Sequence, residues 1–401
     1  MDFAFSDEQE TLRTTAHDWL AKRWPVERVI AWTGEKAAAE PAQKPTEPAE
    51  KPVEKAVQKP VEKAARKPAE KVVEKPAAKV EEKAPKAAAP DTPDKAWDEL
   101  SQLGWLDDEL TVLDLAVIAE EAGYGLLPVP WLMHVSMAAP VLGGRGGKTS
   151  TMAWADHGAL TLAAAATAVD CRAEEAGDGW RLSGVKTRVP AASTAHYVVV
   201  VAQAEAGVGL FVTRPDPRRL RQLSTVDTTR PYSELTLDGT PAEVVVAPGR
   251  ARPVLTAVRQ QTAALLACEG VGVMQRALDT AVAYAKQREQ FGKPIGSYQG
   301  VSYQLADVYT DLQLARSLAY RAAWAVHTGA EETEEAVAAA SACVSEVAPS
   351  GCERAIQALG GIGFTWENAL QRWYKRAQWI ASWEGSATNW REELASWLLD
   401  A

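Results

Sequence analysis

The sequence is poor in cysteine and histidine and has no long apolar run. Its four cysteines, Cys171, Cys268, Cys343 and Cys352, form no Cys-x-x-Cys pair, which indicates reduced core thiols in a cytoplasmic protein. The five histidines lack the spacing of metal ligands, so we expect no metal site. The longest apolar run, residues 159–169, is too short and too rich in alanine to predict a membrane span.

Positive charge is also in short supply. The chain has 43 lysines and arginines against 53 acidic residues, a formal net charge of −10. Because phosphate binding requires a basic face, this balance argues against a nucleic-acid partner. The polar start at Asp2 predicts no signal peptide. With 401 residues, 47% of them hydrophobic, the chain can form two or three packed units.

Residues 36–95 lack glycine and aromatic side chains altogether. Prolines recur every eight residues from Pro52 to Pro76, which blocks a continuous helix, and the other apolar residues of the segment are only alanine and valine. Such a composition cannot bury enough surface to offset chain entropy. We therefore predict a disordered, low-complexity insert in a loop between N-terminal helices, acting as a spacer. A docking tether for an acidic partner is the alternative.

The rest of the chain divides by its hydrophobic period. Helical spacing predicts an N-terminal helical domain in two parts, residues 1–35 and 96–147, with a capping box of Ser6 and Gln9 at its first helix. Alternation at period two predicts a middle β domain over residues 148–250, with short strands that include Leu235 to Leu237 and Val244 to Val246. Helical spacing returns over residues 251–401 and predicts a helical bundle, with apolar stripes from Ala267 to Ala285 and from Leu305 to Ala322. The expected fold is mainly α with a small β domain.

Two C-terminal motifs join charged or amide side chains to glycines. They are Arg288-Glu-Gln-Phe-Gly-Lys-Pro-Ile-Gly-Ser-Tyr-Gln299 and Gln357-Ala-Leu-Gly-Gly-Ile-Gly-Phe364. A fixed positive charge, amide hydrogen bonds and approachable backbone suit an elongated cofactor that carries phosphate. Within a helical sequence, the pair resembles the C-terminal domain of acyl-CoA dehydrogenases.

The resemblance implies a fold and a reaction. The fold is an N-terminal helical domain, a middle β-barrel and a C-terminal four-helix bundle. In the family, a glutamate removes the α-proton of an acyl-CoA thioester and FAD takes the β-hydrogen as hydride, so the chain would be an FAD-dependent oxidoreductase. Electron-transfer flavoprotein is the family's usual oxidant.

The resemblance also assigns site residues. The FAD contacts would be Arg288, Gln290, Phe291, Gln357, Gly360 and Gly361. Glu384, in Trp383-Glu-Gly-Ser386, stands where one branch of the family has its catalytic base, with Ser386 and Thr388 as further flavin contacts. The second position for a base holds Thr262, which cannot serve. In the alternative interpretation, Glu384 is a solvated residue that starts the last helix, and Arg288 is a surface arginine.

The middle domain departs from the family's pattern. Arg188 replaces an aromatic residue beside the flavin, and Pro190 replaces a threonine that bonds near N5. Proline has neither an amide proton nor a hydroxyl, so that contact cannot form. The pattern resembles the reduced subunit of heteromeric α2β2 acyl-CoA dehydrogenases, which often act on bulky chains, including steroid side chains, in β-oxidation. Asp227-Thr-Thr-Arg-Pro-Tyr232 and Gly363-Phe-Thr-Trp-Glu367 also resemble that subgroup.

Three hypotheses follow. The chain is a partner subunit that completes an FAD site held mainly by a second acyl-CoA dehydrogenase polypeptide. Alternatively, it is a self-sufficient homo-oligomeric dehydrogenase with Glu384 as base. In the third, it is a non-catalytic structural subunit in which residues 36–95 are the interaction element.

Overall fold

The computed structural model describes residues 5–33, 92–143, 148–156, 161–167, 169–177 and 179–400. Residues 36–91 of the predicted insert lie outside this part of the chain. The predicted end of the insert at residue 95 is wrong, because α3 (Pro93–Gln102) begins two residues before it. The Thr92 hydroxyl accepts from the Lys95 N–H, and a proline at the first helical position suits a helix start.

The N-terminal part is helical, as predicted. Its elements are α1 (Asp7–Arg23), α2 (Val26–Trp32), α3, α4 (Val112–Tyr124), α5 (Trp131–Met133), the π-helical turn η1 (His134–Ala138) and α6 (Ala139–Leu142). The capping box is confirmed, since the Ser6 hydroxyl accepts from the Gln9 N–H and the Gln9 side chain accepts from the Ser6 N–H.

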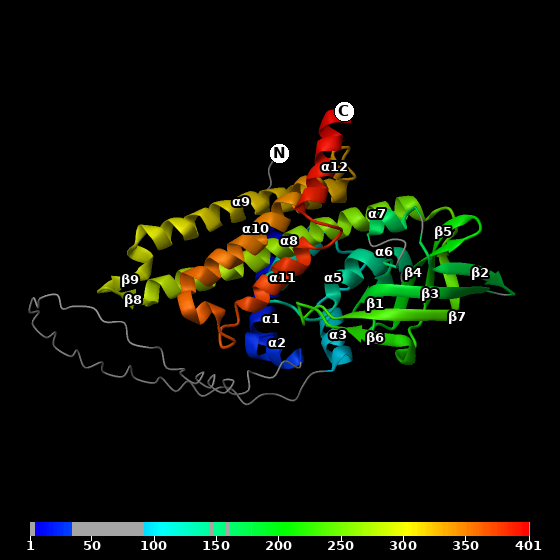
Figure 1. Ribbon diagram of the computed structural model, residues 1–401, viewed down its shortest axis with the longest axis horizontal. Helices are drawn as coiled ribbons and strands as arrows, with labels where there is room; N and C mark the ends of the chain where they lie inside the picture. The colour runs from blue at the N-terminus through cyan, green and yellow to red at the C-terminus, as the bar shows by residue number, and fades with distance from the viewer. Residues whose placement is uncertain are drawn as a thin grey trace, which may run out of the picture. The chain divides into compact units, whose positions relative to one another are not determined.

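The middle part is a small barrel (Figure 1). Its elements are β1 (Ser150–Ala153), α7 (Leu162–Ala165), β2 (Arg172–Ala176), β3 (Gly179–Pro190), β4 (Tyr197–Ala204), β5 (Gly207–Thr213), η2 (Pro217–Arg219), β6 (Leu220–Leu223) and β7 (Tyr232–Val246). β7 pairs with β3 and β5, β5 pairs with β4, and the pair Arg172 and Gln203 joins β4 to β2, which closes the ring.

The C-terminal part is a bundle of four helices with additions. Its elements are α8 (Ala251–Gln287), β8 (Glu289–Gln290), β9 (Lys293–Pro294), η3 (Ile295–Ser297), α9 (Gln299–Thr328), α10 (Thr333–Leu359), η4 (Gly360–Phe364), α11 (Gln371–Ala381) and α12 (Ala387–Asp400). The predicted apolar stripes are buried, from Ala267 to Ala285 on α8 and from Leu305 to Ala322 on α9. The predicted fold class is confirmed.

Two glycines let α4 and α8 approach at backbone distance. A Cβ atom at Gly272 would lie 1.8 Å from the Glu120 carbonyl oxygen, and one at Gly123 would lie 2.1 Å from that of Glu269. The N-terminal helices are therefore fixed against the longest helix of the bundle. Among the described residues, no helix is long and apolar enough to cross a membrane.

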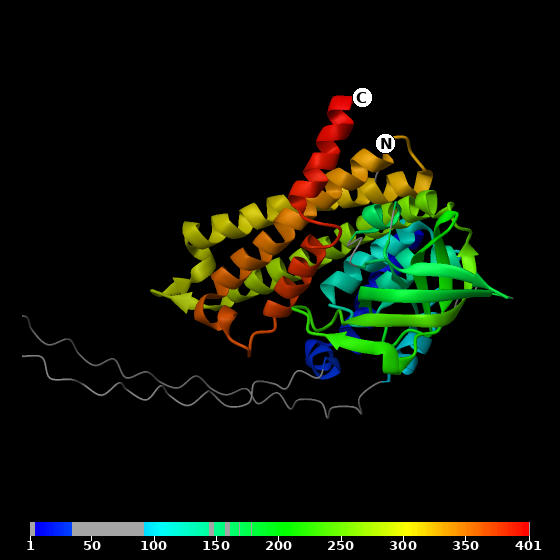
Figure 2. The same ribbon diagram turned by 45° about the vertical axis from the view of Figure 1, so that its right-hand side comes forward.

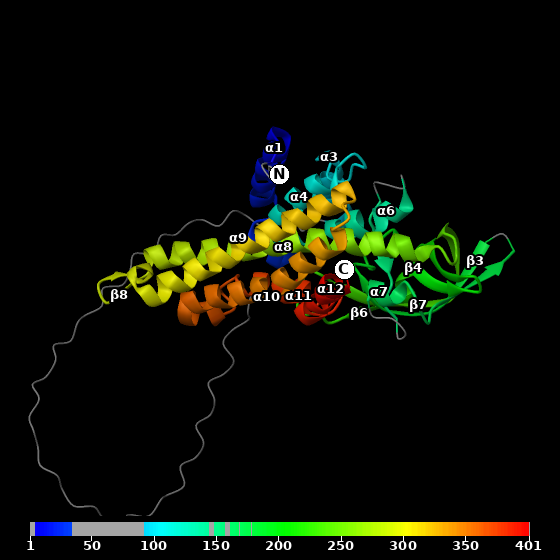
Figure 3. The same cartoon turned by 90° about the horizontal axis from the view of Figure 1, so that it is seen from above.

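The long helix α8 connects the two places where site residues were predicted. It leaves the barrel after β7 and ends at the hairpin of β8 and β9 (Figures 1 and 2). Seen from above, the hairpin and the end of α10 lie at the bundle end remote from the barrel, which we call the bundle tip (Figure 3). The turn from α11 to α12 lies nearer the barrel (Figure 1).

Candidate functional site

The predicted site residues fall into two separate groups. One group is at the bundle tip and contains Arg288, Gln290, Phe291, Gln357, Gly360 and Gly361. The other group is at the turn from α11 to α12 and contains Glu384, Ser386 and Thr388. Within one chain these groups do not form a single site (Figures 1 and 3).

The hairpin at the bundle tip presents an aromatic ring to solvent. Gln290 pairs with Lys293, and Phe291 and Gly292 form the turn between them with φ of +52° and +81°. Positive φ at both turn residues matches the twist of a tight hairpin, but it costs free energy at phenylalanine. The Phe291 residue is 94% exposed, so no contact with the described residues compensates for that cost. Strain of this kind points to a contact made outside the chain.

The other bundle-tip residues leave polar groups available. Arg288 ends α8, its N–H donating to the Tyr284 carbonyl, and its guanidinium makes no ion pair within the described residues. Gln357 is exposed on the last turns of α10. A Cβ atom added at Gly360 or Gly361 would meet nothing within 4 Å, so a ligand can reach the backbone there. This surface suits the phosphate-bearing half of a cofactor.

Glu384 is held in a buried ion pair. Its side chain is 1% exposed, and its Oε2 accepts from Arg259 Nε at 3.1 Å. Its Oε1 accepts from the N–H of Leu162, the first residue of α7, at 2.6 Å. Arg259 also pairs with Glu393 at 2.6 Å and lies over the ring of Trp390. The alternative interpretation of Glu384 as a solvated residue is therefore wrong, because both carboxylate oxygens have partners within the chain.

The neighbours of Glu384 have structural contacts as well. The Ser386 hydroxyl and N–H both donate to Asn389 Oδ1 at 2.9 Å, which caps the start of α12. Thr388 is exposed in the first turn of α12. Thr262 is fully buried on α8, and its hydroxyl has no hydrogen-bond partner in the part of the chain that the structure describes. None of these hydroxyls lies beside Arg288 at the bundle tip.

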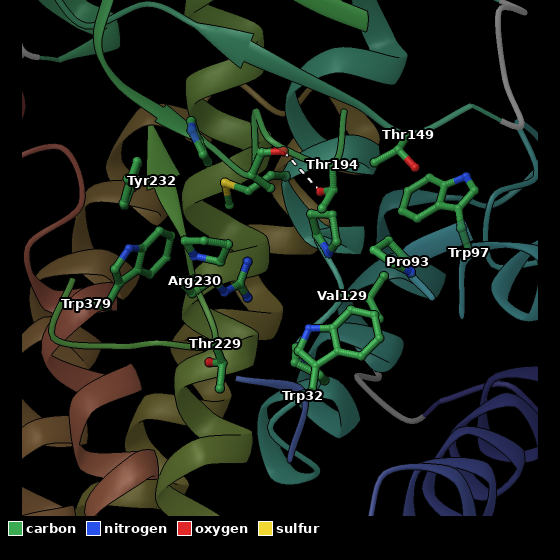
Figure 4. A pocket seen from close by; sticks show the side chains of 16 residues that line it. Trp32, Pro93, Trp97, Val129, Thr149, Thr194, Thr229, Arg230, Tyr232 and Trp379 are labelled. Carbon is green, nitrogen blue, oxygen red and sulfur yellow. Dashed lines mark hydrogen bonds between the residues drawn. The ribbon is translucent and has the colours of Figure 1, made fainter. Parts of the chain in front are cut away.

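A pocket lies where the barrel, the N-terminal helices and α11 meet (Figure 4). We call it the central pocket. Its volume is about 50 Å³, and its lining includes Trp32, Trp97, Pro190, Arg230, Tyr232 and Trp379. Pro190 at the end of β3 pairs with Tyr232 at the start of β7, and the Tyr232 ring stacks on Trp379 with centroids 6.3 Å apart. Burial raises the pKa of Tyr232 to about 12.

A cluster of buried charges adjoins the central pocket, and Arg230 belongs to both. Arg376 on α11 is fully buried and donates to Asp227 and to Glu269, each at 2.5 Å. It also donates to the Thr229 hydroxyl, and Arg230 donates to the same Glu269 oxygen. Burial alone would lower the pKa of Arg376, but the charges of Asp227 and Glu269 outweigh it and raise that pKa. Burial and then the charge of Arg376 lower the pKa of Arg230.

This cluster was missed as a site from the sequence, although the segment Asp227–Tyr232 was noticed. The carboxylate and guanidinium partners are 107 to 149 residues apart, except for Arg230 and Glu269, which are 39 apart. Local spacing cannot reveal such pairs. One sequence feature could have suggested them: three polar residues, Asp227, Thr229 and Arg230, occur together in a short segment just before a strand.

Comparison with known proteins places the family. The model named "Acyl-CoA dehydrogenase, C-terminal domain" matches residues 254–399. Those residues form an acyl-CoA dehydrogenase C-terminal domain. The family resemblance drawn from the two motifs is thereby confirmed.

Individual acyl-CoA dehydrogenases give the extent of the similarity. The chain is 32% identical over 232 residues to glutaryl-CoA dehydrogenase of Desulfococcus multivorans, covering 55% of this chain and 60% of that protein. It is 39% identical over 134 residues to a probable acyl-CoA dehydrogenase, YngJ, of Bacillus subtilis, covering 33% and 35%. The matches therefore span about one third to three fifths of these relatives.

A solved structure shares the whole fold. The ChsE4-ChsE5 complex from Mycobacterium tuberculosis contains a chain that matches with a TM-score of 0.75 at 20% identity, covering 100% of both chains. At this identity the match shows the fold, including the order of helical, barrel and bundle parts.

Proposed function

We propose that this chain is a subunit of a heteromeric acyl-CoA dehydrogenase, in which its bundle tip completes an FAD site held mainly by a second polypeptide. The complex would desaturate an acyl-CoA thioester in the cytoplasm, with electron-transfer flavoprotein as oxidant. FAD supplies the hydride acceptor when bound. The separation of the two groups of site residues supports a site shared between chains. The observation that carries the heteromeric proposal is the central pocket of this chain, because it is too small for a flavin ring.

The bundle tip supports the role of completing a site. Arg288 would pair with the cofactor pyrophosphate, a charge-assisted interaction worth more than a neutral hydrogen bond. The exposed ring of Phe291 would pack on the adenine of the cofactor, and the Gln357 side chain would form a hydrogen bond with the same ADP half. The open backbone at Gly360 and Gly361 permits close approach.

The central pocket supports the loss of this chain's own flavin site. A cavity that binds benzene measures about 150 Å³, so a pocket of about 50 Å³ cannot take a three-ring flavin. Pro190 brings no N–H to it, and the rings of Tyr232 and Trp379 stack at its wall. These residues do not fit an isoalloxazine ring.

The contacts of Glu384 also fit a chain that contributes cofactor contacts to its partner but does not itself remove the α-proton. A general base must reach the proton it removes with a free oxygen. Both Glu384 oxygens are engaged, one with the Leu162 N–H and the other with Arg259. The working base would then belong to the partner subunit.

The test begins with flavin content. The chain expressed alone is expected to contain almost no flavin, and co-expression with a second dehydrogenase subunit is expected to give about half a flavin per chain. The Arg288→Ala variant should lose most of that flavin. Arg252→Ala, an exposed arginine at the other end of α8, is the matched control and should retain it.

Other outcomes would favour the remaining hypotheses. Near-full flavin in the chain alone would support a self-sufficient dehydrogenase with Glu384 as base. A complex of the Arg288→Ala variant with unchanged flavin content and turnover would refute the proposal that Arg288 completes the FAD site of the partner. Loss of complex formation on deletion of residues 36–91 would support a structural subunit that binds through the insert.

A further inference from the structure

The central pocket contains a buried cation with unused hydrogen-bond donors. The Arg230 side chain is 7% exposed, and its Nε and Nη1 atoms are buried without any hydrogen-bond partner in the described residues. Figure 4 shows this side chain among the lining residues, with Trp379 beside it, and its guanidinium carbon lies 5.0 Å from the centroid of the Trp379 ring. A buried donor without an acceptor loses its hydrogen bonds to water and gains none in return. The pocket is therefore incomplete without a bound acceptor.

The second unused donor of the lining is an indole. Trp97 on α3 is 3% exposed, and its Nε1 atom has no acceptor within the described residues. The Thr194 hydroxyl, by contrast, already donates to the Ala191 carbonyl (Figure 4). What the lining lacks is an oxygen acceptor, so the complementary ligand is one that supplies acceptors rather than donors.

The charge balance decides between an anion and a neutral acceptor. The buried cluster holds two guanidinium groups, Arg230 and Arg376, and two carboxylates, Asp227 and Glu269. A bound carboxylate would add an unbalanced buried charge, which is far more costly than a neutral polar group. A carbonyl oxygen accepts from Arg230 and leaves the balance unchanged.

The size and the walls limit the rest of the ligand. A volume of about 50 Å³ holds roughly four water molecules, or a head group of a few heavy atoms. The walls are tryptophan rings, prolines, Val129 and Met133, which suit an aliphatic body. Burial of these apolar atoms contributes to binding in proportion to the area covered.

We propose that the central pocket binds the uncharged carbonyl end of a small aliphatic molecule, with the carbonyl oxygen accepting from Arg230. The ligand class is a ketone, an amide or the carbonyl terminus of a longer chain. The site lies away from the bundle tip and does not depend on the proposed contact of Arg288 with FAD.

The test uses the full chain labelled with 5-fluorotryptophan and followed by fluorine NMR. The Trp379 signal is assigned with Trp379→Phe, and acetone is the probe because its few heavy atoms match the volume of the pocket. The expected result is a saturable shift of this signal, with acetate binding at least tenfold more weakly than acetone. Equal or tighter binding of acetate would overturn the choice of a neutral ligand. No shift at the highest acetone concentration that the folded chain tolerates would mean that only water fills the pocket.

Two variants test the role of Arg230. Arg230→Lys keeps the charge beside Glu269 but removes the unused donors, and it should raise the Kd for acetone at least tenfold. Arg316→Lys, the same change at an arginine of α9 that also pairs with a glutamate, Glu120, should leave the Kd unchanged. If Arg230→Lys does not fold, Val129→Phe fills the pocket without touching the charges and should abolish binding. An unchanged Kd in a folded Arg230→Lys or Val129→Phe chain would refute the site.

Discussion

Glu384 and Arg259 form a buried ion pair, Nε to Oε2 at 3.1 Å, at the junction of the barrel and the bundle. The pair connects α7, through Leu162, with α8, and Arg259 extends the connection to Glu393 on α12. A carboxylate in this position stabilises the contact between two parts of the chain. The same position in the sequence motif would otherwise be interpreted as that of a base.

The first prediction concerns Glu384→Gln. Removing one partner of a buried pair is destabilising, and because Arg259 keeps Glu393 we expect a loss of about 1 to 3 kcal/mol in the free energy of unfolding. The kcat of the heteromeric complex should stay within about twofold of the parent value, because the base is expected on the partner; about 1.4 kcal/mol would be needed for a tenfold loss.

Chemical denaturation and steady-state kinetics on the same preparation check this prediction. Glu393→Gln is the control, since it removes the other, more exposed carboxylate and should cost less. A Glu384→Gln complex that unfolds like the parent, keeps its flavin and has lost turnover would instead identify Glu384 as the base.

The sequence predicted local features of the fold well. Caps, apolar stripes and the fold class depend on residues a few positions apart, as at Ser6 and Gln9. β7 was less predictable, because Leu235–Leu237 and Val244–Val246 suggested two strands. The structure has one strand that bends at Gly239, where φ is +59°, and continues its pairing beyond Pro241.

The candidate site was harder to predict, for a physical reason. The motif around Arg288 places a helix end and a tight turn, both of them local features, at the exposed bundle tip. The state of Glu384 depends on Arg259, which is 125 residues away, and the cluster around Arg376 depends on tertiary contacts of similar range. A motif states which residue types are present, but burial and charge partners decide what they do.

The second prediction concerns Phe291. Because this ring is 94% exposed, Phe291→Ala should leave the free energy of unfolding within about 0.5 kcal/mol of the parent. In the heteromeric complex, the same change should lower flavin affinity at least tenfold, since the ring would lose its contact with the cofactor. Flavin retention during dialysis measures this effect. Val226→Ala, at another exposed apolar residue, is the control; equal retention in both variants would contradict a role for Phe291.

The third prediction is a pH dependence at His134. Its ring is buried against Trp97 with centroids 4.8 Å apart, and its Nδ1 lies 2.7 Å from the Ser150 hydroxyl. Burial lowers its pKa from 6.5 to about 4. The unfolded chain therefore binds a proton at a higher pH than the folded chain does. The contribution to stability is complete above pH 6.5 and falls as the pH drops towards 4, by about 1.4 kcal/mol per pH unit.

Comparison of the parent chain with His134→Gln isolates this contribution. The difference in the free energy of unfolding between the two chains should be largest at pH 7 and smaller by about 2 kcal/mol at pH 5. Burial raises the pKa of Glu121, so the contribution of Glu121 to stability grows as the pH falls, opposite to that of His134. This contribution is the same in both chains and cancels in the comparison. A difference that does not change with pH would contradict a neutral, buried His134.

The fourth prediction concerns the contact of α4 with α8. A Cβ atom at Gly272 would lie 1.8 Å from the Glu120 carbonyl oxygen, so Gly272→Ala must force the two helices apart. We expect a loss of more than about 3 kcal/mol in the free energy of unfolding, at the upper end of overpacking effects.

Gly300→Ala is the matched control, because it lies in α9 and its Cβ would meet nothing within 4 Å. Alanine is the better helix former, so the control should be neutral or more stable by up to about 1 kcal/mol. Thermal unfolding of both variants decides the matter: similar Tm values would show that α4 and α8 do not pack at backbone distance.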